Sequence, residues 1–135
     1  MREIKFRGMD SNGDWHYGLV GYKSTTLLPG GKTGWFISDI DGSPWAYQVR
    51  PETIGQYTGL KDSAGKEIYE GDIVDLLTEI DETAVIEWDD ITACFNILSK
   101  SGGFSATFDN YCGDDLEVIG DIHNTPELLE DNNVH

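Results

Sequence analysis

The sequence predicts a mostly β fold in which N-terminal β-hairpins are joined to a small SH3-like β-barrel, followed by a short C-terminal helical turn. Apolar residues alternate with polar residues at a period of two, and Gly, Asp and Asn separate the short apolar segments. No long segment has helical periodicity. At this length we expect a single domain over residues 1–135, divided into a hairpin part at 1–52, a barrel part at 53–130 and a frayed tail at 131–135.

Two hairpins are expected in the N-terminal part. Turn residues Asn12-Gly13 lie in the first and Asp41-Gly42 in the second, and such pairs are typical of tight hairpin turns. Pro29-Gly30-Gly31 indicates a loop between the hairpins, at residues 23–32. The expected strands are residues 3–7 and 15–19 for the first hairpin, and 33–40 and 45–49 for the second.

The C-terminal part is predicted to be a meander of short strands that curls into the barrel. Glu70-Gly71-Asp72-Ile73-Val74 looks like the first strand of SH3-like barrels, which is an analogy of fold alone. Residues 126–130 are expected to form one helical turn, with Thr125 as its cap and Pro126 at its first position. No longer helix than about two turns is expected. The expected strands are residues 73–78, 84–88, 93–97, 104–108 and 116–122.

The segment from Thr53 to Val74, TIGQYTGLKDSAGKEIYEGDIV, is more specific than generic β-protein. It resembles the signature of the YopX family of phage and prophage proteins. The opening REIKFR at residues 2–7 and the closing EVIGDIHNTPELL at residues 117–129 agree with that resemblance. The chain departs from the family pattern at Gly8-Met9-Asp10 and within residues 121–125.

The resemblance implies a phage or prophage accessory protein and leaves its activity open. Within the signature, glycines are expected where the chain bends sharply, and Asp62 to Lys66 has the composition of a tight turn. Tyr57 and Tyr69 flank that turn and could pair across it. The residues that we expect to specify the fold are Gly55, Tyr57, Gly59, Gly65, Tyr69, Gly71 and Asp72.

The net charge of −16 is concentrated in the second half of the chain. Residues 1–66 carry 8 basic and 7 acidic side chains, whereas residues 67–135 carry one basic and 18 acidic side chains. Such a surface repels nucleic acid and favours a basic host or phage protein as partner, which could itself bind nucleic acid. A charge that serves only solubility is the alternative. The expected acidic binding face consists of Asp89, Asp90, Asp114 and Asp115.

Three tyrosines at strand ends or in loops are further candidates for an interface: Tyr22, Tyr47 and Tyr111. Rigid amphipathic rings bury a large area at a small entropic cost. Together with exposed strand edges, they also suit an alternative function, a self-assembling structural homo-oligomer.

No catalytic residue, metal site or cofactor is predicted. The three histidines and two cysteines lack the spacing of a zinc site or a disulfide framework, and Gly31-Lys32-Thr33 is not followed by a helix as a phosphate loop requires. A carboxylate-dependent metal enzyme is the weaker alternative, because aspartates are plentiful while cations that would hold a phosphate are scarce. With neither a signal peptide nor an apolar run of membrane-spanning length, we expect a cytoplasmic protein without membrane contact.

Overall fold

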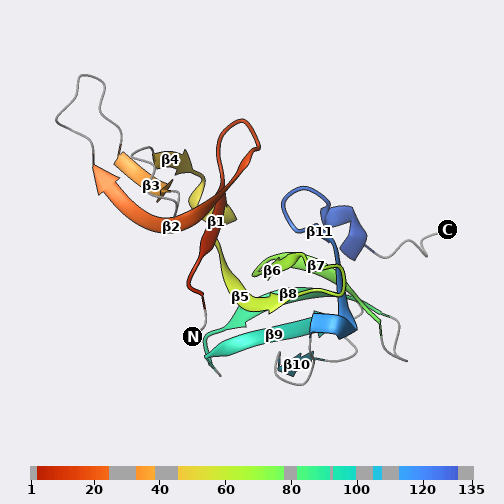
Figure 1. Ribbon diagram of the computed structural model, residues 1–135. Helices are drawn as coiled ribbons and strands as arrows, with labels where there is room; N and C mark the ends of the chain where they lie inside the picture. The colour runs from red at the N-terminus through yellow and green to blue at the C-terminus, as the bar shows by residue number, and fades with distance from the viewer. Residues whose placement is uncertain are drawn as a thin grey trace. The chain divides into compact units, whose positions relative to one another are not determined.

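The computed structural model describes residues 3–24, 33–38, 46–77, 82–91, 93–99, 105–107 and 113–130. In these residues the chain is mostly β-strand, and every described helical segment is a 3₁₀ turn of three or four residues. The predictions of a mostly β fold and of no long helix are confirmed for this part. The chain divides into two compact units, Met1–Tyr57 and Thr58–His135, and the boundary lies within strand β5 (Figure 1).

The first unit contains an antiparallel sheet of hydrogen-bonded order β4-β3-β2-β1-β5, and β5 then continues into the second unit. Both predicted hairpins are present, as β1–β2 and β3–β4. Strand β2 extends through Ser24, so it includes the start of the loop expected at 23–32, whose remaining residues lie outside the described part. The strands are β1 (Phe6–Met9), β2 (Trp15–Ser24), β3 (Thr33–Ser38), β4 (Ala46–Val49) and β5 (Gly55–Lys61).

The segment after β4 is fastened to β1. The backbone N–H of Arg50 donates to the carbonyl of Met9 at 2.8 Å, and the N–H of Met9 donates to Oγ1 of Thr53 at 2.8 Å. Thr53 lies in a short 3₁₀ turn, η1 (Pro51–Thr53), which Pro51 opens. Met9, Val49 and Ile37 are buried and form part of the small core of this unit.

The second unit contains a five-stranded antiparallel sheet of order β10-β9-β8-β7-β11 (Figure 1). The described pairings leave β10 and β11 at the two ends of this order, so closure into a barrel stays a prediction. Strand β9 begins one residue later than expected because Ala93 adopts a left-handed conformation with φ 55°. The strands of this sheet are β7 (Asp72–Leu76), β8 (Thr83–Asp89), β9 (Cys94–Ser99), β10 (Ser105–Thr107) and β11 (Leu116–Asp121), while β6 (Glu67–Tyr69) is hydrogen-bonded to β5 at the end of the first sheet.

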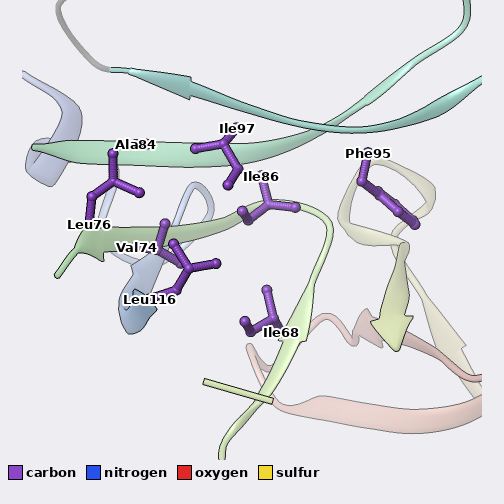
Figure 2. Close-up of a cluster of buried hydrophobic side chains, with 8 residues drawn as sticks. All are labelled: Ile68, Val74, Leu76, Ala84, Ile86, Phe95, Ile97 and Leu116. Atoms are coloured by element: carbon purple, nitrogen blue, oxygen red, sulfur yellow. The ribbon is translucent and has the colours of Figure 1, made fainter. Parts of the chain in front are cut away.

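Alternating residues of these strands form the core of the second unit. Ile86 and Ile97 lie directly opposite each other on β8 and β9, and both are fully buried. The predicted period of two accounts for this arrangement, since it places every second side chain on the inner face. Figure 2 shows the cluster, which consists of Ile68, Val74, Leu76, Ala84, Ile86, Phe95, Ile97 and Leu116.

The tight turn expected at residues 62–66 is present and is attached to β11. The Oδ1 atom of buried Asp62 accepts the backbone N–H groups of Ala64 at 2.9 Å and Lys66 at 2.8 Å, while Oδ2 accepts the N–H of Val118 at 2.9 Å. Burial raises the pKa of Asp62, but these hydrogen bonds and the charge of Lys66 together outweigh burial, so the pKa lies below its ordinary value. One carboxylate therefore closes a turn and joins it to a strand far along the chain.

Strand β11 ends where a 3₁₀ turn, η4 (Pro126–Leu129), approaches it. The β7–β11 register shifts between Val118 and Gly120, and a Cβ added at Gly120 would clash with the side chains of Thr125 and Leu128. The predicted helical turn is confirmed, with Pro126 in its first turn. The predicted capping role of Thr125 is wrong, because its hydroxyl instead accepts the N–H of Asp121 at 3.0 Å and makes no cap hydrogen bond.

We predict that Gly65→Val lowers the free energy of unfolding by more than about 1 kcal/mol. Gly65 has φ +84°, and a Cβ there would meet no atom within 4 Å, so the cost comes from the backbone conformation and not from a clash. Urea unfolding of both proteins measures the difference. Gly65→Asn is the matched control, because Asn tolerates positive φ and should cost clearly less. Equal losses for Val and Asn would contradict this explanation.

We also predict that Asp62→Asn lowers the free energy of unfolding at pH 7 by more than about 1 kcal/mol, since an amide nitrogen would then face a backbone N–H group. Because the folded-state pKa of Asp62 is lowered, its carboxylate stabilises the protein above the unfolded-state pKa, and this contribution is lost as the pH falls through the folded-state pKa.

Urea unfolding of both proteins at pH 7 and at about pH 3 tests the argument. The stability gap between wild type and Asp62→Asn should shrink at the lower pH. Asp90→Asn removes the same charge from an exposed side chain and should be nearly neutral at both pH values. A gap that stays constant with pH would show that ionisation of Asp62 does not contribute.

Candidate functional site

Several carboxylates serve the fold and are therefore poor candidates for ligand binding. Besides Asp62, the buried Asp72 accepts the N–H of Tyr69 at 2.8 Å and closes the turn between β6 and β7. Buried Asp121 accepts the N–H groups of His123 and Asn124, each at 2.9 Å. The chemistry of these turns is the same in each case, since a carboxylate accepts hydrogen bonds from backbone donors that no strand partner reaches.

The first hairpin of the chain uses a carboxylate in the same way. Oδ1 of Asp10 accepts the N–H groups of Asn12 and Asp14, and Oδ2 lies 2.8 Å from Nε2 of His16. The hydrogen bond with His16 is the largest of the effects that lower the pKa of Asp10. The ring of His16 in turn stacks on Tyr47, with ring centroids 4.0 Å apart.

The four aspartates expected to form an acidic face fall into two separate pairs. Asp89 and Asp90 lie where β8 ends and the turn to β9 begins, whereas Asp114 and Asp115 lie in η3 (Gly113–Asp115), before β11. The carbonyl of Asp115 accepts the N–H of Leu77, which directly follows the end of β7. That end of β7 pairs with the start of β8. The length of β8, seven residues or about 20 Å, therefore separates the two pairs.

The pair at the β8–β9 turn lines an open groove of about 450 Å³. Two hydrogen bonds of 2.9 Å hold Asp89 in place: its Oδ1 accepts one from the backbone N–H of Ile91, and its Oδ2 accepts one from the side-chain amide Nδ2 of Asn96. Glu87 and Asp90 are exposed. We call this the hairpin groove, and its lining residues are Glu87, Trp88, Asp89, Asp90, Ile91 and Asn96.

Two large apolar side chains at the hairpin groove are open to solvent. Ile91 is 94% exposed at the tip of the turn, and Trp88 is 43% exposed. Trp88 lies opposite Phe95 and meets its ring edge-on at a centroid distance of 5.1 Å, which fixes the indole at the rim of the core. An isoleucine this exposed loses favourable burial unless a partner covers it.

Ala84, Ile86 and Trp88 alternate along β8, so a period of two places them on one face, and the register agrees. Trp88 is nevertheless partly exposed because it lies beyond the buried part of that face. Ile91 and Asn96 were missed altogether. The signal for Ile91 was present, since an isoleucine directly after Asp89-Asp90 stands within a turn, where apolar side chains cannot be buried locally.

The three tyrosines proposed from the sequence have different surroundings. Tyr22, near the end of β2, is 62% exposed and contacts Trp35 edge-on, with ring centroids 5.4 Å apart. Tyr47 is 40% exposed, and its ring stacks on the ring of His16. Tyr111 lies outside the described residues.

Two further observations concern metals and membranes. In the part of the chain that the structure describes, no three His, Cys, Asp or Glu side chains are grouped as ligands of a metal ion. Nor does any helix among the described residues combine the length and apolar character that crossing a bilayer requires.

Comparison with known proteins identifies relatives along almost the whole chain. A family model described as YopX protein matches residues 5–130. The crystal structure of protein EF1440 from Enterococcus faecalis is similar, with a TM-score of 0.57 and 24% sequence identity over 96% of this chain and 100% of that one. That likeness supports the fold alone. None of the curated proteins matches the chain.

Proposed function

The chain belongs to the YopX family, and from this premise we propose that it is a non-enzymatic accessory protein of a phage or prophage that binds a basic protein in the host cytoplasm. The observation that carries the proposal is the hairpin groove, where an exposed isoleucine and a partly exposed tryptophan stand among three carboxylates. A basic peptide segment with one apolar side chain fits the groove, because the carboxylates attract its cationic side chains and the isoleucine and tryptophan contact its apolar side chain.

The charge distribution supports a basic partner. The unit Met1–Tyr57 contains six basic and six acidic residues, whereas Thr58–His135 contains three basic and nineteen acidic residues. The hairpin groove thus lies on the unit that carries the whole net charge of −16. Such a field accelerates association with a cationic protein and disfavours nucleic acid, and a partner that normally binds nucleic acid has the required basic surface.

Binding energy and steering come from different residues in this proposal. Ile91 supplies apolar area at the centre of the contact, where water is excluded. Glu87 and Asp90 lie around it and attract a lysine or arginine side chain. Asp89 acts mainly by holding the turn, since both of its oxygens accept hydrogen bonds from neighbouring residues.

We predict that the protein binds a fluorescent probe peptide of alternating arginine and leucine, and that Ile91→Ser raises the dissociation constant about tenfold, as expected for a lost buried isoleucine. The double variant Glu87→Gln/Asp90→Asn should slow association more than it speeds dissociation. Fluorescence anisotropy measures the affinity and stopped-flow mixing the rates, at about 0.05 M and about 0.5 M salt.

The matched control is Asp114→Asn/Glu117→Gln, which removes the same two charges from exposed positions at the other end of β8. It should change the dissociation constant much less than the groove variant. Equal effects of the two double variants would show that the probe senses only the overall charge of the unit, and would reject the hairpin groove as the binding site.

A further inference from the structure

The sheet of the first unit exposes large apolar side chains on both faces. On β2, Leu19 and Tyr22 are both exposed, and their separation of three residues places them on opposite faces. An antiparallel sheet ordinarily keeps one face polar toward water. Of the described residues, the exposed large apolar side chains of β2 to β4 are Tyr17, Leu19, Tyr22, Trp35 and Tyr47.

One of these faces carries a row of aromatic rings. Tyr22 lies directly opposite Trp35, and Tyr47 lies opposite Ile37, which is two residues from Trp35 and hence on the same face. His16 extends the row by stacking on Tyr47. We call His16, Tyr22, Trp35 and Tyr47 the aromatic row. It crosses the three strands β2, β3 and β4, which lie side by side in Figure 1.

Three rings of the aromatic row, those of Tyr22, Trp35 and Tyr47, are exposed around a buried centre, whereas the His16 side chain is only 16% exposed. Ile37 is fully buried, while Trp35 and Tyr22 are 38% and 62% exposed. The edge-to-face contact between these two rings limits their rotation, so little side-chain entropy remains to be lost when a partner covers them. Rigid, partly exposed aromatic side chains of this kind are typical of the central residues of protein interfaces.

We infer that the aromatic row is the interface through which a second copy of this chain binds. The unit that carries it has six basic and six acidic residues, so it neither repels its own copy nor attracts a cationic partner by net charge. The other unit, at −16, opposes self-association. A two-fold contact between copies of the aromatic row fits this charge distribution, because it brings together the apolar rings of the two units that have no net charge.

This interface is separate from the hairpin groove and has the opposite dependence on salt. Salt screens the repulsion between the two acidic units, so self-association should strengthen as salt rises. Binding of a cationic probe at the hairpin groove should weaken over the same range. The sign of the salt effect therefore distinguishes the two surfaces, and either can fail without the other.

Sedimentation velocity over a range of protein concentrations, at about 0.05 M and about 0.5 M salt, tests the inference. Wild type should form dimers that become tighter at the higher salt. Tyr22→Ser/Trp35→Ser should raise the dimer dissociation constant at least about tenfold. The control Leu19→Ser changes an exposed residue of the same strand on the opposite face and should leave dimerisation unchanged.

Hydrogen exchange of the wild type adds a measurement that needs no variant. Backbone amides of β2 and β3 next to the aromatic row should gain protection in concentrated solution relative to dilute solution, while those of the β8–β9 turn should not. Three results would overturn the inference: a wild type that stays monomeric at its highest soluble concentration, a dimer that weakens with salt, or an equal loss of dimer in Leu19→Ser.

Discussion

The structure depends on aspartate carboxylates that accept backbone hydrogen bonds at turns. A chain of short strands has many turns, and the N–H groups there lack the strand partners that satisfy donors within a sheet. Asp10, Asp62, Asp72, Asp89 and Asp121 each accept at least one such N–H. An acidic sequence is thus partly a requirement of the fold, and the charge available for recognition belongs to the remaining exposed carboxylates.

The fold was largely predictable because its determinants are local. Alternation placed Ile86 and Ile97 on an inner face, Asn12-Gly13 marked a hairpin turn, and the glycine signature marked the tight turn at residues 62–66. The role of Thr125 could not be predicted, because its hydroxyl is bonded to Asp121 in an arrangement set by the close approach of η4 to Gly120. Composition cannot distinguish a cap from such a bond.

The candidate site was less predictable, because it depends on strand register. Asp89-Asp90 and Asp114-Asp115 look equivalent as acidic pairs in the sequence, yet β8 holds them at opposite ends of its length. Only the first pair stands beside Ile91 and Trp88. The aromatic row similarly required the pairings of Trp35 with Tyr22 and of Ile37 with Tyr47, which no sequence period specifies.

The pairing of β11 with β7 has a consequence for synthesis on the ribosome. Leu116, at the start of β11, completes a core whose other strands begin at residue 67. A nascent chain that has emerged only as far as β9 leaves one edge of β7 without its hydrogen-bonded neighbour, and its turn at Asp62 lacks the N–H of Val118. The second unit should therefore reach its final structure after most of its length has left the exit tunnel, and until then it offers an unpaired strand to chaperones.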